Sequence, residues 1–143
     1  HIDVHCNQRR LPIEARIRLF LDVLAAVADA HVNLIVHRDI KPANIMYEPQ
    51  SDTVKVTDFG IARVADSSKT KTGMVLGTPS YMSPEQLSGK KVDGKSDLFS
   101  LAVSLYQMAC GKLPFEGDSM APVLGNGDDI LVDTRDAAER LRD

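Results

Sequence analysis

The stretch His37-Arg38-Asp39-Ile40-Lys41-Pro42-Ala43-Asn44 decides the fold and the chemistry of this chain. It places a carboxylate, an ammonium and a carboxamide close together, and a second carboxylate follows in Asp58-Phe59-Gly60. Carboxylate and amide oxygens are ligands that Mg²⁺ prefers. A further carboxylate can orient a hydroxyl group, and an ammonium can neutralise phosphate charge. This set of side chains, in this order, points to phosphoryl transfer.

The segment after this stretch predicts a β-hairpin. Residues 45–47 and 54–57 look like two short strands, and the turn-like residues 49–52 separate them. A hairpin would bring Asn44, which precedes the first strand, near Asp58, which follows the second. The pattern therefore predicts that two ligands of one divalent metal ion converge here.

The segment before the stretch predicts an amphipathic helix that opens at Leu11-Pro12, because proline is tolerated in a first helical turn. Asn33 is a suitable stop, since asparagine accepts a left-handed backbone. Apolar residues at steps of three and four predict one buried face. Its members are Ile13, Ile17, Phe20, Leu21, Leu24, Val27, Ala28 and His31. His31, at its end, is expected to pack or to cap the helix.

A second long helix is predicted at residues 97–109, where almost no polar face is left, so we expect a buried helix. Ser96 or Asp97 can cap its start, and Gly111 ends it. A short helix is expected to begin at residues 83–86. Residues 1–10 are polar without a clear period, and residues 62–76 read as a mobile loop. The predicted fold is mostly α with a small β-hairpin, in the α+β class.

Size and composition indicate one soluble globular domain of 143 residues, with 43% apolar and 26% charged residues. A net charge of -3 gives no reason to expect nucleic acid or an anionic membrane as partner. Cys6 and Cys110 lie far apart and predict free thiols in a reducing compartment. No signal peptide or membrane-spanning segment is visible. We therefore expect a cytoplasmic location.

The motifs resemble those of the eukaryotic-type serine/threonine protein kinases, and their wording is similar to that of bacterial members. Besides the two stretches quoted first, they are Gly77-Thr78-Pro79-Ser80-Tyr81-Met82-Ser83-Pro84-Glu85-Gln86, Lys95-Ser96-Asp97-Leu98-Phe99-Ser100 and Leu113-Pro114-Phe115. The resemblance runs from about residue 11 to residue 119. It implies that residues 1–119 form part of a kinase catalytic domain, from the hinge end through the catalytic loop and activation segment to the core helix. Residues 120–143 remain an unassigned tail.

The resemblance implies ATP and Mg²⁺ as cofactors and a protein substrate bearing serine or threonine. Asp39 would be the catalytic carboxylate, and Lys41 would lie by the transferred phosphate, as in the serine/threonine branch. Asn44 and Asp58 would hold Mg²⁺. Thr78 would contact Asp39 and Lys41 and shape the site for the acceptor. Met46 would form part of the floor under adenine, although an ordinary strand core residue is an equally good interpretation.

Other residues are implied to act structurally. His37 would pack on Phe59 rather than serve as a general base, and Gly60 would permit the turn after the metal ligand. Arg38 would bind a phosphate on the predicted loop. The candidate residues to carry that phosphate are Ser67, Ser68, Thr70 and Thr72, and we expect it on Thr70 or Thr72.

Two further structural roles concern the second half of the chain. Asp97 would hydrogen-bond the catalytic-loop backbone, or would merely cap its helix. Glu85 would pair with a late arginine that is not recognisable here. Arg135, Arg140 or Arg142 would be the substitute for that partner.

Three functions remain open from the sequence. The chain contains no Gly-x-Gly-x-x-Gly and no Val-Ala-x-Lys. The resemblance therefore implies the C-terminal, large lobe of a kinase without its N-terminal lobe, with His1 inside a longer reading frame. We expect an active parent kinase and an isolated chain that is nearly inactive. The alternatives are a kinase-like regulatory or docking module without catalysis, and an α-rich soluble domain with neither activity.

Overall fold

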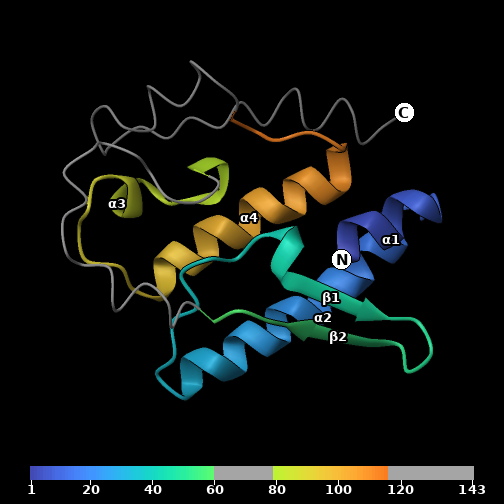
Figure 1. Cartoon of the computed structure of the whole chain (residues 1–143), viewed down its shortest axis with the longest axis horizontal. Coiled ribbons are helices and arrows are strands. Elements are labelled where there is room, and N and C mark those ends of the chain that lie inside the picture. Colours follow the sequence, from blue (N-terminus) through green and yellow to red (C-terminus); the bar gives the residue numbers. More distant parts are fainter. Residues whose placement is uncertain (60–78, 116–143) are drawn as a thin grey trace.

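The computed structural model describes residues 1–59 and 79–115, which form four α-helices, two short 3₁₀ helices and one hairpin (Figure 1). In chain order these elements are α1 (Ile2–Gln8), α2 (Ile13–Val32), η1 (Pro42–Asn44), β1 (Ile45–Glu48), β2 (Thr53–Val56), η3 (Pro79–Tyr81), α3 (Pro84–Leu87) and α4 (Gly94–Cys110). The predicted mixture of helices and one small antiparallel sheet is confirmed. Within these described residues, no helix is long and apolar enough to cross a membrane.

The hairpin forms where the sequence predicted it, and β1 and β2 pair in antiparallel register. The paired positions are Ile45 with Val56, Met46 with Lys55, Tyr47 with Val54, and Glu48 with Thr53. Side chains alternate between the two faces of a strand. Accordingly, Ile45 is fully buried and Tyr47 packs against the core, while Met46 faces outward. The core side of the hairpin rests on α2.

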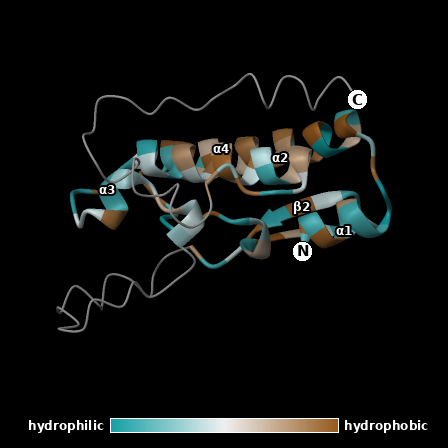
Figure 2. Ribbon diagram, turned by 90° about the horizontal axis from the view of Figure 1, so that it is seen from above, coloured by the Kyte–Doolittle hydropathy of each residue, from teal (hydrophilic) through white to brown (hydrophobic). Residues whose placement is uncertain are grey.

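The core lies where α2 meets both α4 and the hairpin (Figure 1). Its buried members are Ile2, Cys6, Leu19, Phe20, Val23, Val27, Ile40, Ile45, Leu101 and Met108. Figure 2 shows brown, apolar segments along both long helices, whereas the loops that join the elements are mostly hydrophilic. The two helices are therefore held together by apolar burial, which is the dominant favourable term in folding.

The predicted buried face of α2 is partly wrong. Phe20 and Val27 are buried, but Ile17, Leu21 and Leu24 are exposed. The buried stripe instead comprises Leu19, Phe20, Val23, Val27 and Ala30. Apolar residues occur around most of the circumference of this helix, so steps of three and four fit more than one stripe. Contact with α4 and β2 decides which stripe is buried, and that contact is not readable from periodicity.

The end of α2 also differs in detail from the prediction. Asn33 is the C-cap, but its φ of -86° is right-handed, and Leu34 takes the left-handed conformation with a φ of 61°. Asn33 instead ends the helix through its side chain, whose Nδ2 donates to the Asp29 carbonyl at 2.8 Å. The Asn33 backbone amide donates to the same carbonyl at 3.2 Å, so the asparagine closes the last turn with both its main chain and its side chain.

The helix α4 begins three residues before the predicted start, and its cap is Asp93, which accepts from the Lys95 amide at 2.8 Å. The prediction that Ser96 or Asp97 caps the helix is therefore wrong. Its C-cap is Gly111 at a φ of 73°, as predicted.

Burial around α4 is uneven, which corrects the prediction of a helix buried all round. Leu98 is 57% exposed, and the buried side carries four polar residues. They are Ser96, Asp97, Ser100 and Ser104. Ser100 donates to the Tyr81 carbonyl at 2.7 Å and so ties η3 to α4. The buried side of α4 is therefore a polar seam as well as a packing surface.

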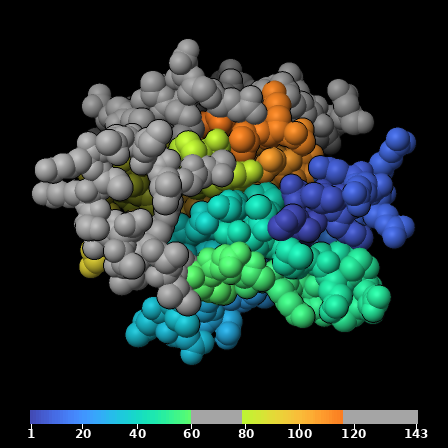
Figure 3. All heavy atoms as spheres, in the orientation of Figure 1, coloured from blue at the N-terminus to red at the C-terminus, as the bar shows by residue number. Residues whose placement is uncertain are grey.

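The helix α1 was not predicted, because only Ile2 and Cys6 mark its buried side. Arg16 of α2 holds it in place: its guanidinium donates to the Cys6 carbonyl at 3.2 Å and to the Met108 carbonyl of α4 at 2.8 Å. Figure 3 shows α1, in dark blue, between the green hairpin and the orange end of α4. Cys6 and Cys110 are free thiols, as predicted, and burial raises the pKa of Cys6.

This arrangement predicts that α1 contributes to stability through Ile2 alone among its aliphatic residues. Ile2 is fully buried in the core, whereas Val4, on the same helix, is 43% exposed. We expect Ile2→Ala to lower the free energy of unfolding by about 2–5 kcal/mol. The matched variant Val4→Ala should change it by less than about 0.5 kcal/mol. Urea unfolding followed by circular dichroism measures both, and similar losses would show that α1 is not packed as described.

Candidate active site

The loop between α2 and η1 is held against α4 by a single buried carboxylate. Asp97 of α4 has no exposed surface, and its two oxygens accept from the backbone amides of His37 and Arg38, each at 2.8 Å. Its Oδ2 also lies 2.8 Å from His31 Nε2 at the end of α2. A buried carboxylate is costly unless it is hydrogen-bonded. These contacts make Asp97 an anchor for the loop, and they show that His31 does more than pack or cap.

The ring of His37 is buried, and both of its nitrogens are engaged. Nδ1 accepts from the Asp39 amide at 3.2 Å, so the proton of the ring is on Nε2, which donates to the Thr57 carbonyl at 2.9 Å. The ring lies against Phe59, with ring centroids 4.5 Å apart. A ring without a free nitrogen cannot take a proton from a substrate. His37 instead joins the loop to the end of β2.

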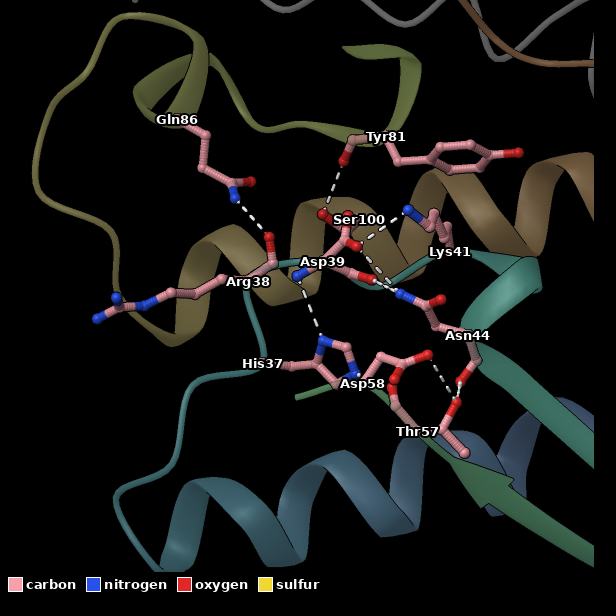
Figure 4. Close-up of polar contacts among 10 residues, drawn as sticks. All are labelled: His37, Arg38, Asp39, Lys41, Asn44, Thr57, Asp58, Tyr81, Gln86 and Ser100. Carbon is pink, nitrogen blue, oxygen red and sulfur yellow. Dashed lines mark hydrogen bonds and ion pairs between the residues drawn. The ribbon is translucent and has the colours of Figure 1, made fainter. Parts of the chain in front are cut away.

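Asp39, Lys41 and Asn44 form one connected group (Figure 4). The Asp39 Oδ2 atom accepts from Lys41 Nζ at 2.9 Å and from Asn44 Nδ2 at 3.1 Å. Asn44 Nδ2 also donates to the Asp39 carbonyl at 2.8 Å. These contacts use one carboxylate oxygen of Asp39, and the described residues provide no hydrogen-bond partner for the other. The carboxylate is therefore fixed in orientation and still has an oxygen free to accept a proton or hydrogen bond.

Asp58 lies beside Asn44 because pairing continues past the strands: the Thr57 amide donates to the Asn44 carbonyl at 2.9 Å. Thr57 Oγ1 is 3.2 Å from that carbonyl and 3.5 Å from Asp58 Oδ2, and its one proton can serve only one of them at a time. Asp58 takes a left-handed φ of 58°, which Asp tolerates better than most residues. Sequence reasoning missed Thr57, although the predicted hairpin placed it beside Asn44.

The donor set at this point suits a hard divalent cation. Asn44 uses its amide nitrogen toward Asp39, which leaves its Oδ1 available, and Asp58 has an exposed carboxylate. Among residues 1–59 and 79–115, no group of three or more His, Cys, Asp or Glu side chains could hold a metal ion. A bound Mg²⁺ would therefore take its remaining ligands from water or phosphate, as Mg²⁺ usually does.

The helix α3 contacts the loop through Gln86. The predicted short helix forms here, and Ser83 and Gln86 make a capping box at its start. Gln86 Nε2 also donates to the Arg38 carbonyl at 2.7 Å, a contact that sequence reasoning missed. The Arg38 side chain extends away from Asp39 (Figure 4) and makes no hydrogen bond or ion pair with a described residue.

Glu85 has a partner that differs from the predicted arginine. Its Oε1 accepts from the Ser96 hydroxyl of α4. Burial opposes ionisation of Glu85, but the hydrogen bonds from Ser96, from the backbone and from Ser83 outweigh it, so its pKa is lowered. Arg135, Arg140 and Arg142 lie outside the described residues. Glu85 therefore ties α3 to the start of α4.

Several predicted residues are not brought into this group by the structure. Met46 is 41% exposed on the outer face of β1, so the interpretation as a strand core residue is wrong. Gly60, Thr70, Thr72 and Thr78 lie outside the described residues, as do Ser67 and Ser68.

The chain is similar to known proteins over most of its length. Residues 3–137 match the sequence profile described as a protein kinase domain. The chain is 50% identical over 111 residues to the serine/threonine-protein kinase pkn3 of Myxococcus xanthus, covering 72% of this chain and 20% of that protein. It is 47% identical over 123 residues to PknB of Mycobacterium tuberculosis, covering 84% and 19%. The chain thus spans about a fifth of the length of these relatives.

A similar fold occurs in a solved structure, the crystal structure of Rad53 1-466 in complex with AMP-PNP. The TM-score is 0.61 at 26% identity, and the match covers 80% of this chain and 28% of that one.

The anchor at Asp97 yields a prediction about stability. Asp97→Asn keeps one oxygen but turns the other into an amide group that faces an N–H donor. Leaving buried donors unpaired costs about 1–3 kcal/mol. We expect this loss in the free energy of unfolding, measured by urea denaturation. The matched variant Asp93→Asn keeps a good helix cap and should cost less than about 0.5 kcal/mol. Equal losses would contradict the anchoring role.

Proposed function

The chain belongs to the protein kinase family, and on this premise we propose that it is part of a bacterial enzyme that transfers phosphate from ATP to serine or threonine hydroxyls of proteins. One observation carries the proposal. The Asp39 carboxylate is held at one oxygen by both Lys41 and Asn44, while Asp58 lies beside Asn44 across Thr57. A polar loop with unrelated acidic residues would not need this shared arrangement.

Each residue then has a separate task. Asp39 orients the acceptor hydroxyl and accepts its proton at the oxygen that no described residue contacts. Lys41, which is held against Asp39, donates a hydrogen bond to the phosphoryl group being transferred. Asn44 and Asp58 supply oxygen ligands for Mg²⁺. The ion, when bound, neutralises phosphate charge.

The described elements correspond in this proposal to the large lobe of the kinase fold, with residues 1–119 inside the catalytic domain and residues 120–143 unassigned. The exposed Met46 would lie under adenine. Thr78 would shape the acceptor site, and Arg38 would bind a phosphate carried by Thr70 or Thr72. The chain contains no Gly-x-Gly-x-x-Gly, and positioning supplies much of the rate of phosphoryl transfer. We therefore infer that the isolated chain is nearly inactive.

A docking module without catalysis is the second candidate, and exposed apolar side chains favour it. Leu34 is 92% exposed, and Ile17, Leu21 and Val32 are exposed on α2. Where exposed apolar side chains of this kind gather into one patch, the patch often marks an interaction site. The two candidates differ in what they require of Asp39 and Asp58. Docking needs neither carboxylate, whereas catalysis needs both.

Phosphate transfer to a protein substrate tests the proposed activity. A longer reading frame that contains this chain should phosphorylate serine or threonine, and Asp39→Asn should lower turnover by about 10²–10⁴-fold. The control Asp22→Asn changes an exposed carboxylate on α2 and should leave turnover unchanged. The isolated chain should show little transfer. Turnover by the isolated chain that Asp39→Asn abolishes would refute the inferred inactivity.

Calorimetric titration with ATP tests the residual nucleotide site without requiring turnover. We expect weak binding by the isolated chain that depends on Mg²⁺, because Asn44 and Asp58 supply only part of its coordination. Asp58→Ala should remove the dependence on the metal, whereas Asp52→Asn, in the hairpin turn, should not. Absence of any binding would favour the docking module.

A further inference from the structure

The side chain of Gln86 joins two parts of the molecule that are far apart in sequence. Its Oε1 accepts from the Ser83 amide at 3.1 Å and lies 3.2 Å from the Ser83 hydroxyl, within the capping box of α3. Its Nε2 donates to the Arg38 carbonyl at 2.7 Å. Figure 4 shows the amide reaching from α3 to this carbonyl. Both ends of the side chain are therefore fixed.

The hydrogen bond from Gln86 is made to the peptide unit that joins Arg38 to Asp39. That unit consists of the Arg38 carbonyl and the Asp39 amide, which lie in one plane. The carbonyl accepts from Gln86, and the amide donates to His37 Nδ1 at 3.2 Å. Two side chains thus bond opposite ends of a single peptide plane. Rotation of this plane would change the direction in which the Asp39 side chain leaves the backbone.

The backbone at Arg38 needs such support because its φ is 70°. A left-handed conformation costs a residue with a β-carbon roughly 1–2 kcal/mol. It persists only where the surroundings fix it. The Asp97 carboxylate holds the amide of Arg38 at 2.8 Å, and Gln86 holds its carbonyl. Release of the carbonyl would leave the strained residue fixed at one end only.

Capping alone does not explain why position 86 is glutamine. Glutamate and glutamine both complete a capping box, since either supplies the oxygen that accepts from the N-cap amide. Glutamate, when ionised, has no hydrogen to donate to the Arg38 carbonyl. The amide satisfies both partners at once, and an ionised carboxylate would satisfy only Ser83.

We propose that Gln86 is a positioning residue for Asp39, which acts by fixing the peptide plane between Arg38 and Asp39. The helix α3 thereby sets the orientation of the carboxylate to which the proposed function assigns proton acceptance. The role of Asp39 in catalysis rests on that proposed function, whereas the link between Gln86 and the peptide plane rests on the hydrogen bonds alone.

Amide hydrogen exchange in the 143-residue chain tests the link without any need for activity. Gln86→Glu keeps the shape and the cap but places a carboxylate oxygen against the Arg38 carbonyl. We expect the Asp39 amide to exchange at least about tenfold faster, the effect of losing one hydrogen bond of about 1.4 kcal/mol. The amide of Val23, in the core, should be unchanged. Equal protection of Asp39 in both proteins would overturn the proposal.

The matched control is Ser83→Ala, which removes the capping hydroxyl but leaves the backbone amide that Gln86 accepts from. We expect it to destabilise α3 and to leave exchange at Asp39 unchanged. Acceleration at Asp39 as large as in Gln86→Glu would show that Gln86 acts only as a cap, and would overturn the proposal. Gln86→Lys, which again offers a donor to the carbonyl, should protect Asp39 better than Gln86→Glu does.

The nitrogen resonance of His37 Nδ1 provides a further test. If Gln86 served only to cap α3, its replacement would leave this resonance unchanged. Its Nδ1 accepts from the Asp39 amide, so the nitrogen resonance of Nδ1 should shift when the peptide plane rotates in Gln86→Glu. Ser83→Ala should leave the resonance in place. An unshifted resonance in Gln86→Glu would contradict the coupling.

Kinetic measurements on the protein encoded by the longer reading frame test whether the hydrogen bond from Gln86 matters for catalysis. Gln86→Glu should lower kcat about tenfold with the KM for ATP unchanged, because orientation of Asp39 and not nucleotide binding is affected. Ser83→Ala should leave kcat unchanged. A wild-type protein without transfer activity would refute the proposed function, while the exchange result would still decide the link. An unaltered kcat in Gln86→Glu would overturn the positioning role.

Discussion

The carboxylate of Asp97 is the contact on which the rest of the structure depends. It is fully buried, and it is balanced by two consecutive backbone amides and by His31. A buried charge is tolerated only when such partners are complete. The partners come from the end of α2 and from the loop that follows it, so α4 cannot pack on α2 without placing that loop. Packing of the two long helices therefore also positions the loop that carries the candidate catalytic residues.

From this anchor the site extends through a small number of polar contacts, each provided by a different element. The ring of His37 connects the loop to the end of β2, and Gln86 connects it to α3. Thr57, the residue before Asp58, donates its amide to the Asn44 carbonyl and so places Asp58 beside Asn44. No single element contains enough of these groups to form the site by itself. The arrangement consequently exists only when the helices and the hairpin are assembled, which links stability to chemistry.

Local patterns predicted the elements well, and tertiary contacts account for most of what they missed. The hairpin followed from two β-rich runs around a turn, and strand pairing explains why Asn44 and Asp58 lie together. The buried face of α2 was misjudged because apolar residues surround that helix. The helix α1 was overlooked because only Ile2 and Cys6 mark its buried side. The capping box at Ser83 is readable from sequence, but the bond from Gln86 to Arg38 joins residues 48 positions apart, and local reasoning has no access to it.

The supports at position 38 contact main-chain atoms only. Asp97 bonds the amide of that residue and Gln86 bonds its carbonyl, so neither depends on the arginine side chain. Any amino acid that tolerates a positive φ could occupy the position and keep the frame intact, whereas proline is excluded twice, by its ring and by its missing N–H. The side chain at position 38 can therefore change while the hydrogen bonds that hold the loop backbone stay the same.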